Sequence, residues 1–286
     1  MQIKESPTLQ NTSDHQLYVQ ECGPDSAPTI VFLHGGGGGG WMWQPQLDSL
    51  PDYHCLVPDL PEHGKSMAVK PLTIQGAAAH IAELIRTRAH GGRAHVVGLS
   101  LGAQVGVALL SMAPEQVDHA VISSALVRPI PGGSLLTPGL VGASFRMSVP
   151  PFKNNNWWIR LNMKYSAGIP AQYFPQFKEV FQNMTEDSFV HQMVENQGFR
   201  LPAGLERVTS PVLVVVGQKE YKAMRQSARD LAAALPGARG YMVVAPERSR
   251  LAEGHNWSMT MPDLFTKTVR AWIEDQPLPT ELQPLA

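Results

Sequence analysis

The sequence predicts an α/β fold in which a mostly parallel sheet carries helices on both faces, and three observations lead to this prediction. Short apolar runs alternate with stretches of helical periodicity over the first 125 residues. The same alternation resumes after residue 205. A Gly-x-Ser-x-Gly segment, residues 98–102, joins one apolar run directly to a helical stretch. Such alternation is typical of parallel sheets, in which helices connect successive strands and cover both faces.

The first half of the chain contains five predicted strands. They cover residues 16–20, 29–33, 54–58, 95–97 and 120–123. Predicted helices cover residues 43–50, 74–88 and 103–110. The first strand alternates polar and apolar residues and is therefore expected to be half exposed, whereas the second is apolar throughout, as expected for a buried strand.

The alternation of strands and helices stops between about residues 127 and 205. Short helical patterns replace it, and seven of the nine phenylalanines lie there. Three of these, Phe174, Phe177 and Phe181, have helical spacing, and a further helix is expected to begin at Thr185. An ordinary helical core explains any single aromatic residue, but the group as a whole indicates an apolar cap over a pocket. The expected parts are an α/β core in residues 1–126 and 206–286 and a helical cap in residues 127–205.

The α/β pattern resumes with a β-branched strand at residues 212–216 and a helix at about 224–235. A strand at 241–244 and a last helix at about 261–273 follow, and the proline-rich tail from residue 275 is expected to fray.

Composition excludes several classes of function. The net charge is −1 and only 16% of the residues are charged, so neither a nucleic-acid partner nor a polybasic membrane contact is expected. No segment predicts a membrane span, and the N-terminus shows no secretory signal. The two cysteines, Cys22 and Cys55, fall in predicted strands and are expected to be buried thiols in a reducing compartment. A cytoplasmic protein is expected; a homodimer is compatible with the sequence, which does not determine the oligomeric state.

The segment Gly98-Leu99-Ser100-Leu101-Gly102 predicts a nucleophile. A sharp turn from strand to helix forces the serine into a strained conformation and requires small residues two positions away on either side. The hydroxyl of Ser100 then stands clear of the sheet, and the amide of Leu101 opens the helix beside the reacting centre.

A serine hydroxyl needs a base and an acid that orients this base. His255 is expected to be the base, because it lies in a loop between the last strand and the last helix, and such loops converge on the crevice at the carboxyl edge of the sheet. Glu220, three residues beyond Gly217, is expected to be the acid. The other position from which an acid could reach, after the strand at 120–123, offers only Ser123, Ser124 and Ala125.

The tetrahedral intermediate needs amide donors for its oxyanion. Gly36 and Leu101 are the expected pair, although the run Gly35–Gly40 leaves open which glycine supplies the first donor. This run also satisfies the dinucleotide-binding pattern G-x-G-x-x-G, with Asp59 after the next strand, but that interpretation leaves Ser100, Glu220 and His255 unexplained. No group of residues has the sequence spacing of a metal site, and no cofactor is expected.

These segments together resemble the capped esterase- and lipase-like members of the α/β-hydrolase fold. The matching pieces are 34–36, 59–66, 98–102, Gly217-x-x-Glu220 and Gly254-His255. The resemblance implies a sheet of about eight strands with a helical cap inserted after the sixth, and a structural role for His63. The chain departs from the family at Glu62, where the usual glycine is replaced by a charged residue near the cavity rim, and at Glu220, where aspartate is commoner.

The expected activity is hydrolysis of a small, largely apolar carboxylic ester through an acyl-enzyme on Ser100. Trp41, Phe174 and Phe177 are the expected substrate-binding residues. Lactone or thioester hydrolysis, carbon–carbon bond hydrolysis, acyl transfer and cofactor-free perhydrolysis stay open, as does a ligand receptor on the same fold. The natural substrate cannot be read from the sequence.

Overall fold

The computed structural model describes residues 4–5, 16–130, 132–133, 137–244, 246–247 and 249–285. Within these ranges a single nine-stranded sheet has the order β1-β2-β4-β3-β5-β6-β7-β8-β9. Its six central strands are parallel: β4 (His54–Pro58), β3 (Thr29–Leu33), β5 (Ala94–Leu99), β6 (Val117–Ser123), β7 (Val212–Gly217) and β8 (Arg239–Val243). The antiparallel strands are β1 (Lys4–Glu5) and β2 (Val19–Cys22) at one edge and β9 (Leu282–Pro284) at the other. The predicted α/β architecture is confirmed.

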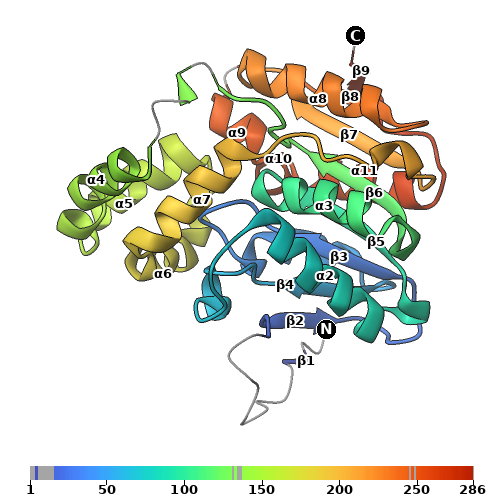
Figure 1. Cartoon of the computed structure of the whole chain (residues 1–286), viewed down its shortest axis with the longest axis horizontal. Helices are drawn as coiled ribbons and strands as arrows, with labels where there is room; N and C mark the ends of the chain where they lie inside the picture. The colour runs from blue at the N-terminus through green and yellow to red at the C-terminus, as the bar shows by residue number, and fades with distance from the viewer. Residues whose placement is uncertain are drawn as a thin grey trace.

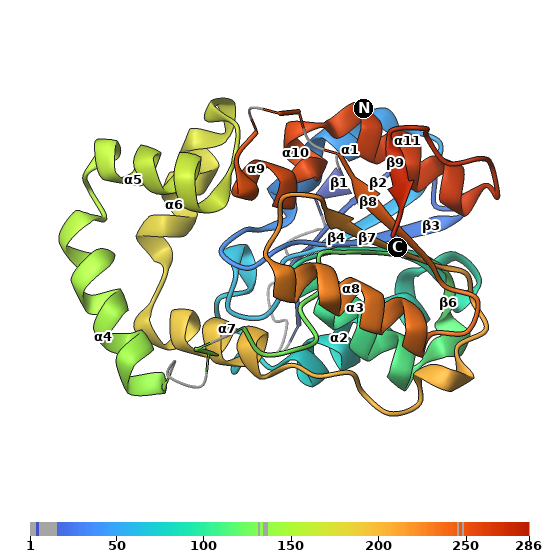
Figure 2. The same ribbon diagram turned by 90° about the horizontal axis from the view of Figure 1, so that it is seen from above.

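Helices cover both faces of the sheet, as Figures 1 and 2 show. One face carries α2 (Ile74–Arg88), α3 (Leu101–Met112) and α8 (Lys222–Ala234). The other carries α1 (Gln44–Ser49), α10 (Trp257–Thr260) and α11 (Pro262–Ile273). Strand β3 shows why its sequence is apolar throughout: Val31 and Leu33 belong to the core under the first set of helices, and Ile30 and Phe32 to the core under the second.

The remaining long helices lie between β6 and β7 in the chain and project to one side of the sheet (Figures 1 and 2). They are α4 (Pro138–Ser148), α5 (Asn156–Asn162), α6 (Phe174–Asn183) and α7 (Glu186–Gly198). Side chains of the preceding residues cap several of them. Thr185 Oγ1 accepts a hydrogen bond from the Ser188 amide at 3.1 Å, so that α7 begins where its sequence predicts. We call residues 127–205 the inserted segment.

Several predicted strands have different bounds in the structure: β6 begins at Val117 and not at residue 120, and β8 begins at Arg239 and not at residue 241. β2 begins at Val19 rather than at Gln16, because its ladder with β4 runs from Val19 opposite Pro58 to Cys22 opposite Cys55. The tail does not fray after residue 275: β9 pairs with β8, and Leu282 is buried against the second core. A partner strand far away in the sequence thus overrides the local proline signal.

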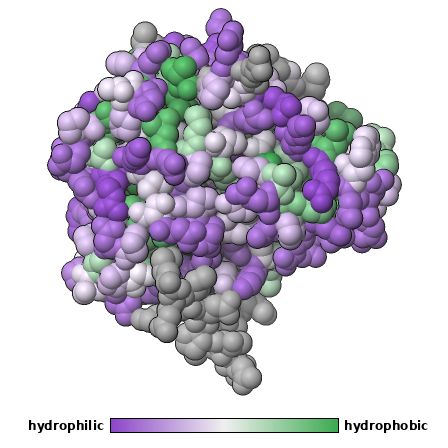
Figure 3. All heavy atoms as spheres, turned by 180° about the vertical axis from the view of Figure 1, so that it is seen from behind, coloured by the Kyte–Doolittle hydropathy of each residue, from purple (hydrophilic) through white to green (hydrophobic). Residues whose placement is uncertain are grey.

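Polar side chains cover most of the face in Figure 3, with hydrophobic ones in small groups. Within the described residues, no helix combines the length and the apolar character that a membrane crossing requires. The expectation of no secretory signal concerns residues 1–6, of which only 4–5 are described. Cys22 and Cys55 are buried free thiols in neighbouring strands.

Candidate active site

Ser100 lies in a strained turn between β5 and α3. Its φ of 56° and ψ of −116° are unusual for a residue with a side chain. A β-carbon at Gly98 would lie 2.6 Å from the carbonyl oxygen of Gly102, and one at Gly102 would overlap the carbonyl of Leu33. Only glycine fits at both positions, and the Ser100 side chain stays partly exposed. The turn therefore presents the hydroxyl at the carboxyl edge of the sheet.

Glu220 and His255 form a hydrogen-bonded pair at the same edge. His255 Nδ1 lies 2.8 Å from Glu220 Oε2. The other carboxylate oxygen accepts from the Ser124 hydroxyl at 2.6 Å and from the Gly217 amide at 2.8 Å. Glu220 is only 3% exposed, so these three donors satisfy a buried charge.

The pair shifts both titrations. Burial raises the pKa of Glu220, but the charge of His255 and the three hydrogen bonds outweigh it, and the pKa lies below the ordinary glutamate value. Burial lowers the pKa of His255, but the charge and the hydrogen bond of the Glu220 carboxylate raise it by more. The net pKa is therefore above that of a free histidine. The pair therefore favours the ion pair that forms when His255 accepts a proton.

His255 ends the short helix α9 (Leu251–His255) and does not lie in an open loop as expected. Gly168 of the inserted segment packs against the Ala252 backbone of this helix so closely that a side chain would overlap it. Among the described residues, no hydrogen bond joins Ser100 Oγ to His255 Nε2. Bonds of this kind often tighten only when substrate is bound.

The glycine run after β3 resolves into amides with different partners. Gly38 N donates to Gly35 O at 3.2 Å, and Gly40 N donates to Asp59 Oδ1 at 2.7 Å. Gly37 N lies 2.9 Å from Gln192 Oε1 and 3.2 Å from His63 Nε2. Gly36 N has no acceptor among the described residues and stays available for a ligand. The Asp59 carboxylate accepts hydrogen bonds from the Gly40 and Lys65 amides, so its oxygens are already used by the protein backbone and not directed at a ribose as a dinucleotide site would require.

Two buried histidines hold the loops around these glycines. His34 Nδ1 lies 2.8 Å from Gly35 O, and His34 Nε2 accepts from Leu60 N at 3.0 Å. A carbonyl only accepts and an amide N–H only donates, so His34 is neutral with its hydrogen on Nδ1. Burial and the neighbouring His63 lower the pKa of His34 to about 3. His34 therefore ties the end of β3 to the end of β4.

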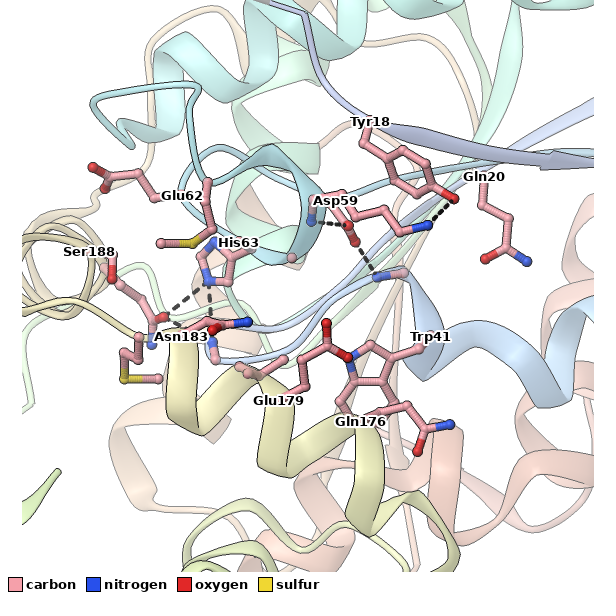
Figure 4. Close-up of a pocket in the computed structure, with 18 residues that line it drawn as sticks. Tyr18, Gln20, Trp41, Asp59, Glu62, His63, Gln176, Glu179, Asn183 and Ser188 are labelled. Carbon is pink, nitrogen blue, oxygen red and sulfur yellow. Dashed lines mark hydrogen bonds between the residues drawn. The ribbon is translucent and has the colours of Figure 1, made fainter. Parts of the chain in front are cut away.

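A pocket of about 260 Å³ lies between this loop and helices α6 and α7 (Figure 4). Trp41 lines it, together with Val180 and Met184 of the inserted segment. Neither Phe174 nor Phe177, the other two expected binding residues, lines this pocket, and its lining does not include Ser100, Glu220 or His255. Phe177 is 8% exposed and packs in the core beside Phe181, whereas Phe174 lies under the guanidinium of Arg160.

Glu62 lines the pocket, in agreement with its expected place near the cavity rim, but it is buried, at 3% exposure. Its φ of 59° explains why glycine is usual in the family at this position. Its carboxylate lies 2.9 Å from Nδ1 of His191 on α7 and accepts from Leu72 N at 3.2 Å. In Figure 4 this carboxylate points away from Asp59 and Trp41. Glu62, where the family usually has glycine, thus joins the core to the inserted segment through its contact with His191.

Sequence reasoning missed two polar residues of this region. Ser124 follows β6 directly, and its sequence position shows no carboxylate there but not that its hydroxyl reaches Glu220. Gln192 lies on α7 at a distance in sequence that no local pattern connects to the glycine run.

One group of described residues has side-chain ligand atoms within 4.8 Å of one another, namely Glu21, Asp25 and His54. The Glu21 carboxylate is already paired with His54 and with Arg88. His54 begins β4, at the opposite end of that strand from Asp59. This group therefore lies at the opposite edge of the sheet from Ser100, Glu220 and His255.

Comparison with known proteins finds relatives that match this chain over most of its length. A protein of Gibberella zeae named as an AB hydrolase superfamily protein is 26% identical over 96% of this chain and 91% of its own length. A protein of Pseudomonas syringae named as a carbamate hydrolase is 28% identical over 92% of this chain and 99% of its own. The solved enol-lactonase of Burkholderia xenovorans superposes with a TM-score of 0.70 at 23% identity, over 90% of this chain and 96% of that one, which shows a common fold.

The family model for the alpha/beta hydrolase family matches residues 30–268. This match runs from β3 to α11 and includes Ser100, Glu220 and His255. The chain belongs to the alpha/beta hydrolase family.

Proposed function

We propose that this protein is a serine hydrolase that cleaves a carboxylic ester of a small, largely apolar substrate through an acyl-enzyme on Ser100. The observation that carries the proposal is the 2.8 Å hydrogen bond between Glu220 and His255. It lies at the sheet edge from which the strained Ser100 turn also rises. A buried acid that orients a histidine, at the sheet edge that also carries a partly exposed serine, is the arrangement needed to activate a hydroxyl.

The proposed reaction has two steps, acylation of Ser100 and hydrolysis of the acyl-enzyme, and His255 moves a proton in both. His255 Nε2 takes the Ser100 proton as Oγ attacks the ester carbonyl, and Glu220 stabilises the imidazolium through Nδ1–H. The Gly36 and Leu101 amides donate to the oxyanion. His255 then protonates the leaving alcohol. Water, deprotonated by the same nitrogen, attacks the acyl-enzyme and releases the carboxylic acid and Ser100.

The apolar preference rests on the inserted segment, which we propose acts as a cap. Trp41 packs 5.9 Å from Tyr173, measured between ring centres, and Val180 and Met184 add apolar surface to the pocket. A negatively charged ester would lose hydration there and would face the buried carboxylates of Asp59 and Glu62, which also line the pocket.

A carbamate is a second candidate substrate, favoured by the name of the Pseudomonas syringae relative. The same serine, histidine and amides would transfer a carbamoyl group in place of an acyl group, because both reactions pass through a tetrahedral oxyanion.

The test compares wild-type protein with Ser100→Ala on p-nitrophenyl acetate, p-nitrophenyl butyrate and a p-nitrophenyl carbamate. We expect many turnovers per molecule from the wild type, faster with butyrate than with acetate, and no catalysis from Ser100→Ala. A fluorophosphonate probe should label Ser100. Equal rates from the two proteins would exclude the serine mechanism, and a single burst without turnover would favour a receptor.

A further inference from the structure

Helix α7 is joined to the core by polar side chains on one face. Four of its residues take part: His191 bonds to Glu62, Gln192 to Gly37, Glu195 to the Ile74 amide at 2.8 Å, and Asn196 to Gln104 at 3.0 Å. They lie at positions i, i+1, i+4 and i+5, which share one side of a helix. These contacts fix α7 against the core at the level of the glycine run.

Gln192 is the member of this set that reaches the loop carrying Gly36. Its Oε1 lies 2.9 Å from Gly37 N and 3.1 Å from His63 Nε2. The dashed lines at His63 in Figure 4 belong to this cluster. Because Gly37 N–H only donates, the oxygen of the Gln192 amide must face it. The amide nitrogen then lies beside Gly36, 2.7 Å from the place where a β-carbon would be.

His63 has the same requirement on the other side of the Gly37 amide. Its Nδ1 lies 2.9 Å from the carbonyl oxygen of Pro61, so Nδ1 carries the hydrogen and Nε2 is an acceptor. Burial lowers the pKa of His63, which keeps Nε2 unprotonated. The Gly37 N–H is therefore shared between two acceptors, Gln192 Oε1 and His63 Nε2, which lie 3.1 Å apart with no hydrogen atom of their own between them.

This arrangement determines which amide can serve an oxyanion. Gly37 has a φ of 66°, and its N–H is held toward α7. Gly36 N, one residue earlier, has no acceptor among the described residues. The Gly35 backbone approaches Ser100, with 3.6 Å between the place of a β-carbon at Gly35 and Cβ of Ser100. The loop thus runs from contact with Ser100 to contact with Gln192 within three residues.

We propose that Gln192 is a positioning residue for the oxyanion loop: by holding the Gly37 amide against α7, it leaves the Gly36 amide directed at the reacting carbonyl. This inference rests on the proposed function, because it assigns Gln192 a part in catalysis at Ser100. In this proposal α7 does more than cover the pocket, because its Gln192 side chain sets the geometry of the glycine loop after β3.

The test compares two matched variants of the full chain. Gln192→Met and Glu195→Met each replace an acceptor of a backbone N–H by a side chain of similar length, one turn apart on α7. We measure kcat and KM with p-nitrophenyl butyrate, inhibition by a boronic acid that forms a tetrahedral adduct with serine, thermal unfolding, and hydrogen exchange of the Gly37 amide. Gln192→Asn, which withdraws the acceptor by one methylene, replaces Gln192→Met if that variant does not fold.

In Gln192→Met we expect kcat to fall at least tenfold with KM changed less than threefold, since a displaced donor acts on the transition state. Boronate affinity should fall by the same factor as kcat/KM, and Gly37 exchange should accelerate. Glu195→Met should lower the unfolding temperature similarly but keep kcat/KM within threefold of wild type. Equal kinetic effects in the two variants, or an unchanged kcat in Gln192→Met, would overturn the inference. Activity in Ser100→Ala would instead overturn the proposed function itself.

Discussion

Replacing Glu220 by glutamine tests the orientation of His255 with almost no change in shape. Oε1 of Glu220 accepts from Gly217 N and from the Ser124 hydroxyl. The backbone N–H cannot reverse, so the glutamine must place its oxygen there and its NH₂ group toward His255 Nδ1. That nitrogen then has to accept, the ring hydrogen moves to Nε2, and Nε2 can no longer take the Ser100 proton.

The loss of charge can be estimated separately. Glu220 is 3% exposed, so water screens the pair poorly. For charge centres about 4 Å apart, an effective dielectric constant of about 20 gives about 4 kcal/mol of attraction between carboxylate and imidazolium. An increase of about 1.4 kcal/mol in the activation free energy lowers a rate tenfold, so kcat is expected to fall about a thousandfold. The wrong tautomer adds to this loss.

The assay is p-nitrophenyl butyrate hydrolysis against pH, with circular dichroism to verify folding. In the wild type, the acid limb of kcat/KM should have its midpoint above the ordinary histidine pKa, because Glu220 raises the pKa of His255. In Glu220→Gln the residual activity should have its midpoint at lower pH. A folded Glu220→Gln protein with kcat within threefold of wild type would refute this reasoning and place the acid elsewhere.

Three further predictions concern Ser124, Glu62 and His95. Ser124→Ala removes one hydrogen bond to the buried carboxylate, so kcat/KM should fall about tenfold, consistent with about 1.5–3 kcal/mol for a bond to a charged group; an unchanged value would make Ser124 irrelevant to the acid. Glu62→Gly relieves a left-handed conformation that costs roughly 1–2 kcal/mol, whereas Glu62→Ala keeps it, so urea unfolding should find the alanine variant less stable; the reverse order would contradict the strain argument. Burial and His119 lower the pKa of His95 to about 4, below the value of about 6.5 in the unfolded chain. The unfolded chain therefore binds more protons between these two values, and the free energy of unfolding should decrease by up to about 3 kcal/mol as the pH falls from about 6.5 to 4. Urea midpoints of His95→Asn should show a weaker pH dependence over that range, and identical curves would exclude His95 as a source.

The strands and long helices could be predicted because their signals are local. Residues 29–33 and 54–58 form strands as predicted, and α2 has its predicted bounds, since a continuous apolar run or a capped periodic stretch decides structure over a few residues. The tail around Leu282 could not be predicted in this way, because its partner β8 lies far away in the sequence and outweighs the local prolines.

The residues of the candidate site can likewise be divided into those that local sequence predicts and those that depend on tertiary packing. Ser100 and the two glycines around it follow from steric requirements within five residues. Glu220 and His255 could be selected because both follow strands of a parallel sheet, whose carboxyl ends meet at one edge. The contacts of Glu62 and the burial of Phe177 depend on how the inserted segment packs, which no periodicity expresses.

The sequence by itself determined the α/β architecture, the strained turn at Ser100 and the edge of the sheet where chemistry can occur, because each of these follows from local sterics or from the order of strands and helices. Only the tertiary structure decided that Ser124 bonds to Glu220, that Gly37 is held by Gln192 while the Gly36 amide has no acceptor among the described residues, and that Glu62 is buried. Those outcomes depend on hydrogen bonds between residues 96 to 155 positions apart, and their geometry exists only after the distant parts of the chain have packed together.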